Sequence, residues 1–198
     1  MSVREPGGTP VGEAIRTLLL DPGHDMDARA EMLLFAAARA QLVARVIAPA
    51  LRAGSDVVAD RYVDASLAYQ GVGRALGIDV VRSVNAVATG GLLPDLTLLL
   101  DIDTGIGLER ARGETCVRAA AGKEAAGGRG SGDRMEDEVV AFHRRVREGF
   151  LLLAKKEPHR ISVIDARGSV AAVQRAIQEV VAQMLRGRGD GPGEERSR

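Results

Sequence analysis

The sequence predicts an α/β protein with a parallel sheet and helices on both of its faces, and two observations lead to this fold class. Short apolar runs alternate along the chain with longer stretches in which apolar residues recur every three or four positions. The clearest run, 96–101, is continuously apolar, which is typical of a strand that is covered on both faces. Strands separated by helices pair in parallel, because each such connection crosses over the sheet.

The first half of the chain begins with a long helical stretch, expected over 27–54. Asp27 can cap its start and Gly54 can end it. Pro49 should kink its last turns, since proline has no N–H to donate to the helix. A short buried strand is expected next, at 56–60.

The alternation of helix and strand continues to the end of the apolar sequence. A helix from about Asp64 is loosened by Gly71 and Gly73, because glycine weakens helices. A long helix at 134–156 carries apolar residues three and four apart, which predicts one buried face. The other expected elements are a helix at 79–88, a strand at 96–101, a short helix at 104–112, a strand at 161–165 and a helix at 169–185.

The composition is that of a globular chain with balanced charge. Of 198 residues, 45% are hydrophobic, which is enough for a packed core. The 27 basic and 27 acidic side chains cancel, which argues against a protein that grips nucleic acid or an anionic membrane over its whole surface. The single cysteine, Cys116, allows no internal disulfide, so we expect a reducing, cytoplasmic location. No apolar run in the sequence approaches the roughly 20 residues that span a bilayer, so we expect no membrane-spanning helix.

One domain is expected over 1–186, and two segments stand apart by composition. The stretch at about 110–134 is rich in Gly and Ala and dotted with Arg and Lys, which predicts a mobile, basic lid. Residues 187–198 contain no large apolar side chain and are expected to form a disordered tail.

Polar residues at the carboxyl ends of strands are candidates for a site, because ligands of open α/β sheets bind there. Asp60 and Arg61 stand at the end of the strand expected at 56–60. A carboxylate in this place can hold a metal ion or water, and the neighbouring guanidinium can bind phosphate with two hydrogen bonds. The alternative is a local ion pair that closes the strand.

Two helical clusters have side chains that suit a nucleobase. Phe35 and Arg39 are four apart and share a helix face, and a flat ring beside a planar guanidinium favours stacking and hydrogen bonding to a base. Ser66, Tyr69 and Gln70 form a second cluster, suited to a polar heterocycle with its sugar or phosphate. The alternatives are a core Phe beside a solvated Arg, and a polar helix face.

Two loops complete the set of candidates. The turn at 4–9 is compact, since Pro6 fixes one backbone angle and the glycines permit close approach to a ligand. In the expected lid, Arg110 and Arg112 are among several cations suited to close over phosphates. Either segment can equally be an ordinary solvated loop. The 3 histidines and Cys116 lack metal-ligand spacing, and the sequence has no Gly-x-Ser-x-Gly elbow.

Taken together and in chain order, five segments resemble the thymidylate kinase family. The resemblance covers roughly residues 3–185 and implies a P-loop kinase fold, ATP as phosphate donor, Mg²⁺, dTMP as the small-molecule acceptor, and a homodimer. The segments are Arg4–Thr9, Glu31–Gln41, Asp60–Gly71, Asp133–Glu136 with the following helix, and Val163–Ala166.

The resemblance implies a role for each matching residue. Phe35 would stack on thymine, Arg39 would hydrogen-bond the base, and Tyr69 would lie against the sugar and disfavour a 2′-hydroxyl. Phosphoryl transfer depends on positioning and positive charge more than on covalent chemistry, which agrees with the basic residues in this set. Of the other residues, Pro6, Ser66 and Gln70 would line the substrate site. Arg61 would hold the acceptor phosphate, and Asp60 would lie near the metal ion and the reacting phosphates. Arg110 and Arg112 would neutralise charge on the phosphates of ATP.

The family opens with a strand, a Gly-x-x-x-x-Gly-Lys-[Ser/Thr] loop and a helix, and these 198 residues contain no such loop. The resemblance places that strand in mid-sheet, between the strands that end at Asp60 and Asp101. The chain as written is therefore expected to lack the first strand and the P-loop helix, and to transfer phosphate weakly or not at all.

Three functional hypotheses remain open. The first is a thymidylate kinase that converts dTMP to dTDP with ATP, in dTTP synthesis. The second is a non-catalytic kinase remnant that binds dTMP or a partner protein. The third is a kinase for another nucleoside monophosphate, against which Phe35, Arg39 and Gln70 argue.

Overall fold

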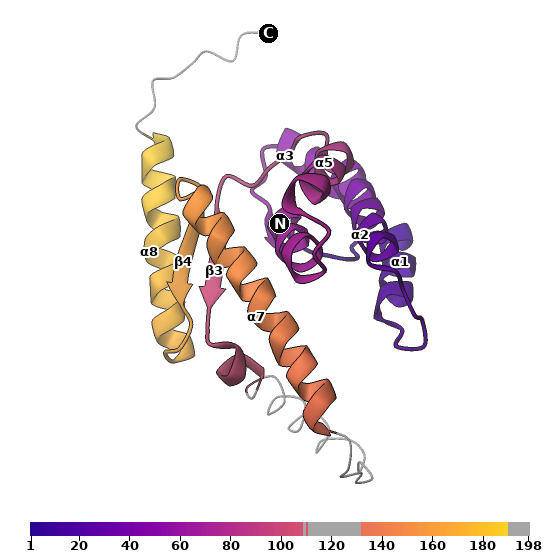
Figure 1. Ribbon diagram of the computed structural model, residues 1–198. Coiled ribbons are helices and arrows are strands. Elements are labelled where there is room, and N and C mark those ends of the chain that lie inside the picture. The colour runs from indigo at the N-terminus through magenta and orange to yellow at the C-terminus, as the bar shows by residue number, and fades with distance from the viewer. Residues whose placement is uncertain (109, 111–131, 190–198) are drawn as a thin grey trace, which may run out of the picture. The chain divides into compact units, whose positions relative to one another are not determined.

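The computed structural model describes residues 1–108, 110 and 132–189, and it divides into two compact units (Figure 1). The first unit comprises Met1–Leu93 and the long helix α7 (Gly132–Lys156) as far as Leu153. The second comprises Pro94–Gly128 and Ala154–Arg198, as far as these ranges are described.

The sheet of the first unit pairs two short parallel strands, β1 (Ser2–Arg4) and β2 (Val58–Asp60), with Val3 opposite Ala59. The strand at this position was expected to be buried, and that expectation is wrong. All of β2 is exposed, and the Val58 side chain is 68% exposed. Among the described strands β2 pairs with β1 alone, so its faces do not gain the cover that a wide, doubly covered sheet provides.

A long helical rod covers this sheet and supplies much of the core. Helix α2 (Ala28–Leu42) continues without a break through a π-helical turn, η1 (Val43–Ile47), into α3 (Ala48–Arg52). The Asp27 side chain caps its start by accepting a hydrogen bond from the Arg29 N–H, as the sequence predicts. Val3 of β1 packs with Leu42, Val43 and Ile47 in one buried cluster.

The helix type changes just before Pro49, where a kink is expected. The π-turn η1 ends at Ile47, two residues before the proline, and a helix must accommodate a residue without an N–H there. A second π-helical segment, η2 (Leu67–Gly73), follows the short helix α4 (Val63–Ser66). This second segment contains the two glycines that were expected to loosen the helix.

Two further helices of the first unit are α1 (Pro10–Leu20), which precedes α2 in the chain, and α5 (Ile78–Thr89), which follows η2. Helix α1 lies beside α2 in Figure 1, and α5 packs against α2 and η2. Helix α5 confirms the expected helix at 79–88 and ends at Gly90, whose φ of 61° is the left-handed conformation that glycine readily adopts.

The second unit contains a parallel pair of strands, β3 (Thr97–Asp101) and β4 (Ile161–Asp165), followed by the helix α8 (Val170–Gly189) (Figure 1). Their residues pair in order from Thr97 with Ile161 to Asp101 with Asp165. The expectation that β3 is covered on both faces is wrong, because Leu100 is 50% exposed. Residues 104–108 form a short helix, which begins where the sequence predicts one.

The α/β fold class with parallel strands and helices is confirmed, and two elements at the start of the chain are additional to those expected. These are β1, which is too short for a periodic pattern, and α1, which begins at Pro10 behind a Thr9 cap. Helix α8 continues to Gly189, beyond residue 187, where a tail was expected to begin. The other tail residues, 190–198, and most of the expected lid, 111–131, lie outside the described residues.

Candidate functional site

A cavity of about 110 Å³ lies in the first unit, among side chains from the 4–9 turn, α2 and the α4–η2 segment. Pockets that hold a whole small-molecule ligand measure about 300–1,000 Å³, so this cavity can enclose only a part of a nucleotide. The residues that line it are Glu5, Phe35, Arg39, Arg61, Ala65, Ser66, Tyr69 and Gln70. The structure thus brings together six residues that the sequence singles out, from two segments that are far apart in the chain.

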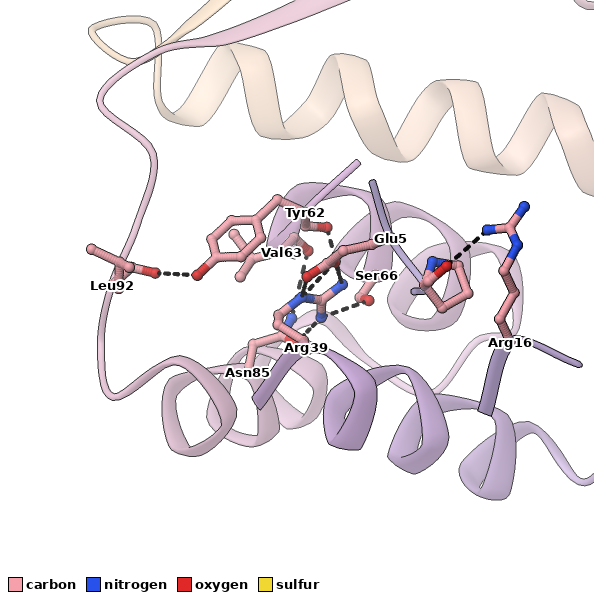
Figure 2. Close-up of polar contacts among 9 residues, drawn as sticks. Glu5, Arg16, Arg39, Tyr62, Val63, Ser66, Asn85 and Leu92 are labelled. Atoms are coloured by element: carbon pink, nitrogen blue, oxygen red, sulfur yellow. Dashed lines mark hydrogen bonds and ion pairs between the residues drawn. The ribbon is translucent and has the colours of Figure 1, made fainter. Parts of the chain in front are cut away.

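The Arg39 side chain lies at the centre of a buried polar network (Figure 2). Its Nε and Nη2 donate to the Glu5 carboxylate, with a shortest distance of 2.6 Å. Its Nη1 donates to Ser66 Oγ at 3.0 Å and to Asn85 Oδ1 at 2.6 Å. The second hydrogen of Nη2 reaches the backbone carbonyl of Tyr62 at 3.3 Å.

These contacts occupy all five N–H groups of the Arg39 guanidinium. Glu5, which the sequence reading did not select, balances the charge of Arg39. Burial raises the pKa of the Glu5 carboxyl, and the Arg39 charge and hydrogen bonds pull it down. The hydrogen bond between Arg39 and a base stays a prediction, and it would require Arg39 to exchange or share a present partner.

Tyr62 contacts this network with both its backbone and its ring. Its hydroxyl donates to the carbonyl of Leu92 at 3.2 Å, and its ring lies 5.6 Å from the Arg39 guanidinium carbon (Figure 2). Burial, together with the charge of Glu5, raises the pKa of Tyr62 to about 12. The hydroxyl is therefore a neutral donor at neutral pH and ties the segment after α5 to the site.

The mouth of the cavity is built around Tyr69. Its ring makes edge contacts with Phe142 and Phe150 of α7, with both pairs of ring centroids 6.2 Å apart. The Arg61 guanidinium lies 4.9 Å from the Tyr69 ring centroid and 3.4 Å from its hydroxyl. Arg61 is exposed and has a φ of 66°, a conformation that is uncommon outside glycine and that occurs often at functional sites. The arrangement presents a positive charge beside an aromatic wall.

The turn at 4–9 is held by its own contacts. The Pro6 carbonyl accepts a hydrogen bond from Arg16 Nη1 at 2.8 Å (Figure 2), and the Thr9 side chain caps α1. A Cβ added to Gly8 would lie 2.7 Å from Leu42 Cδ1, so this glycine permits a close approach to the protein core. Pro6 is buried and is not among the residues that line the cavity, and its contact with a substrate stays a prediction.

Asp60 ends β2, and its side chain is exposed. Its backbone carbonyl accepts a hydrogen bond from the Glu5 N–H at 3.0 Å, which joins the strand to the 4–9 turn. In the described part of the chain, no group of three or more His, Cys, Asp or Glu side chains comes together as a metal centre. Magnesium needs only one or two protein carboxylates when phosphates and waters complete its shell, so the exposed carboxylate of Asp60 fits that ion.

Arg110 belongs to the second unit. Its guanidinium donates to the backbone carbonyls of Ala166 and Arg167, both at 2.9 Å, just beyond the end of β4. Arg112 lies outside the described residues. The roles given to both arginines stay predictions.

One expectation about membranes needs correction. Among the described residues, the helical stretch Ala28–Arg52 is long and apolar enough to cross a membrane, by length and composition alone. The same helix packs against α1, α5 and η2, and its Ala38, Arg39 and Leu42 are at most 1% exposed. These contacts are those of a core helix.

Comparison with known proteins identifies the family of this chain. A family model described as thymidylate kinase matches residues 1–177. A thymidylate kinase from Halothermothrix orenii is 49% identical over 182 residues, which are 92% of this chain and 81% of that protein. One from Enterococcus faecalis is 45% identical over 184 residues, 92% of this chain and 81% of its own. One from Desulfosudis oleivorans is 51% identical over 171 residues, 86% of this chain and 76% of its own.

The family match covers the cavity, both pairs of strands and the first part of α8. It includes every described residue that the sequence singles out for substrate, phosphate or metal. By sequence, the chain belongs to the thymidylate kinase family of P-loop kinases.

Proposed function

We propose that this chain binds dTMP with the thymine ring in the cavity beside Phe35, as the acceptor in the conversion of dTMP to dTDP by ATP. The observation that carries the proposal is the lining of the cavity, where six residues chosen from the sequence come together. The cavity, of about 110 Å³, would take the pyrimidine ring, and the sugar and phosphate would lie outside it, toward the exposed Arg61. The product would enter dTTP synthesis.

Each residue then has a physical task. Phe35 offers the ring face on which thymine stacks, and base–aromatic stacking contributes roughly 1–3 kcal/mol. Tyr69, fixed by its two edge contacts with α7, would pack against the deoxyribose and leave little room for a 2′-hydroxyl. Arg61 would hold the acceptor phosphate, since a guanidinium binds phosphate with paired hydrogen bonds.

ATP and Mg²⁺ enter the proposal through the family. Asp60 is the described residue that would hold the ion, and Arg110 and Arg112 would lie against the phosphates of ATP. The bound ion neutralises charge on the reacting phosphates. A homodimer and a cytoplasmic location belong to the same proposal, with the family as their support.

Binding of dTMP tests the proposal directly. Replacing Phe35 with Ala removes the stacking face, and we expect dTMP to bind about tenfold more weakly, as measured by titration calorimetry. Leu33→Ala is the matched control, because Leu33 is on the same helix and 55% exposed. The proposal fails if the chain does not bind dTMP, or if the two substitutions weaken binding equally.

A measurement of turnover tests the non-catalytic remnant. These 198 residues contain no Gly-x-x-x-x-Gly-Lys-[Ser/Thr] loop, so we expect them to bind dTMP and to form dTDP slowly or not at all from ATP. Rapid formation of dTDP would contradict that expectation and would exclude the remnant.

A further inference from the structure

The amide of Gln70 is one wall of the cavity, and a carboxylate lies behind it. Gln70 is 3% exposed, and its Nε2 donates to Glu31 Oε1 at 2.7 Å. The other oxygen of Glu31 accepts a hydrogen bond from Arg74 Nη2 at 3.0 Å. Glu31 is on α2 and Gln70 is in η2, so the contact joins two of the elements that line the cavity.

This contact fixes the direction of the amide. An ionised carboxylate only accepts hydrogen bonds, so the end of Gln70 that faces Glu31 must be its NH₂ group. The carbonyl oxygen, Oε1, is then the other end of the amide. Within the described residues, Oε1 accepts no hydrogen bond from the protein, which leaves it available to a ligand in the cavity.

The hydrogen bonds of the other polar side chains show which donors and acceptors remain for a ligand. The N–H groups of Arg39 are all engaged by protein acceptors. Ser66 Oγ accepts one of them, so its own proton remains for donation. The cavity therefore offers an acceptor at Gln70 and a donor at Ser66.

This pattern distinguishes the two common pyrimidines. Thymine has an N3–H donor beside the O4 acceptor, whereas cytosine has an acceptor at N3 beside the N4 amino donor. An acceptor and a donor in the cavity match the edge of thymine and oppose that of cytosine. A buried polar group that meets the wrong partner costs more than a missing contact, because both groups stay unpaired.

We propose that Glu31 is a positioning residue that holds the Gln70 carbonyl toward the cavity, so that the site accepts a pyrimidine with an N3–H and rejects one without it. This inference rests on the proposed binding of dTMP. It adds Glu31, which does not line the cavity, to the residues that determine specificity. It also attributes the discrimination between thymine and cytosine to the direction of the Gln70 amide.

The test is Glu31→Gln, which keeps the shape of the side chain but gives it both a donor and an acceptor. Gln70 can then bond to it in either direction. We expect the ratio of the dCMP to the dTMP dissociation constant to fall about tenfold, mainly because dCMP binds better. Arg74→Ala is the matched control, because it removes the other partner of Glu31, is partly exposed and leaves the Gln70 contact in place. The control should keep the ratio of the wild-type chain.

Each outcome decides the matter. A fall in the ratio in Glu31→Gln alone, with an unchanged melting temperature, supports the positioning role. Equal weakening of both nucleotides would mean that Glu31 only ties α2 to η2, and would overturn the inference while dTMP binding stands. A wild-type chain that binds both nucleotides equally would overturn it as well. If the wild-type chain binds neither nucleotide, the proposed function fails and the inference falls with it.

Discussion

The molecule contains two ion pairs of nearly equal length in opposite surroundings. Arg39 and Glu5 approach to 2.6 Å with side chains 1% and 3% exposed. Arg167 and Asp165 approach to 2.7 Å with side chains 71% and 58% exposed. Each pair joins a guanidinium to a carboxylate, so distance alone does not separate them.

The difference lies in what else each pair contacts. Water and salt screen the exposed pair, and such pairs contribute little to stability. The buried pair has lost its hydration, and that loss is offset only because further acceptors complete the shell of Arg39. Loss of any one residue of the buried network around Arg39 is therefore expected to destabilise the fold around the cavity. Loss of the exposed pair is expected to change the stability little.

The largest expected effect is that of Arg39→Met. It leaves the Glu5 carboxylate buried without a partner, which costs about 3–5 kcal/mol of unfolding free energy. A urea unfolding curve measures this. The double variant Glu5→Leu with Arg39→Met should recover much of the loss, because no buried charge remains. If Arg39→Met unfolds at the wild-type urea concentration, the distinction between the two pairs is wrong.

A smaller effect is expected from Asn85→Ala. The substitution removes the acceptor 2.6 Å from Arg39 Nη1 and leaves one buried N–H unpaired, at a cost of about 1–3 kcal/mol. Ser83→Ala on the same helix is the control, because Ser83 is exposed and its hydroxyl bonds to the Asp79 carbonyl of its own helix. Equal urea midpoints for the two variants would show that the network tolerates a missing member.

The smallest effect on stability is expected at the exposed pair, where a pKa is the better measurement. Hydrogen bonds from the side chain and backbone of Arg167 lower the pKa of Asp165 to about 2. Arg167→Ala should raise it partway toward the ordinary value, because the backbone N–H still donates. An NMR titration of the carboxyl carbon follows this change. A pKa that stays at about 2 in the variant would show that the side chain is not its cause.

The sign of the accompanying pH dependence follows from the direction of that shift. The pKa of Asp165 is lower in the folded chain than in the unfolded one, so the unfolded state binds the proton more readily. Any stability that the pair contributes is present above the ordinary pKa of Asp and is lost as the pH falls toward about 2. Any loss of stability in Arg167→Ala should therefore be greatest above about pH 5, where it stays small because the pair is exposed, and should disappear as the pH falls toward about 2.

Local pattern was enough to place many of the elements and most of the cavity. The strand at 161–165 and the helix α5 have clear apolar periods, and the structure has both. Phe35 with Arg39, and Ser66 with Tyr69, were recognised because residues three or four apart share a helix face. The resemblance to thymidylate kinases then joined these separate clusters into one site.

The local sequence pattern could not identify hydrogen-bond partners that lie far apart in the chain. Glu5 is 34 residues from Arg39, and Glu31 is 39 residues from Gln70. Local spacing cannot pair such residues, because it is tertiary packing that brings them together. The exposure of β2 was missed for the same reason, since an apolar run does not reveal how many strands stand beside it.

The π-helical segment η2 has a consequence for changes in chain length. It holds Tyr69 and Gln70 at the cavity with a turn that is wider than that of an α-helix. Deleting one residue from Leu67–Gly73 would let the segment wind as an α-helix and would turn the residues after the deletion by about 100° relative to Ser66. We therefore expect this stretch to reject single-residue insertions and deletions that leave its composition almost unchanged. In η2, the number of residues is as much a part of the site as their identity.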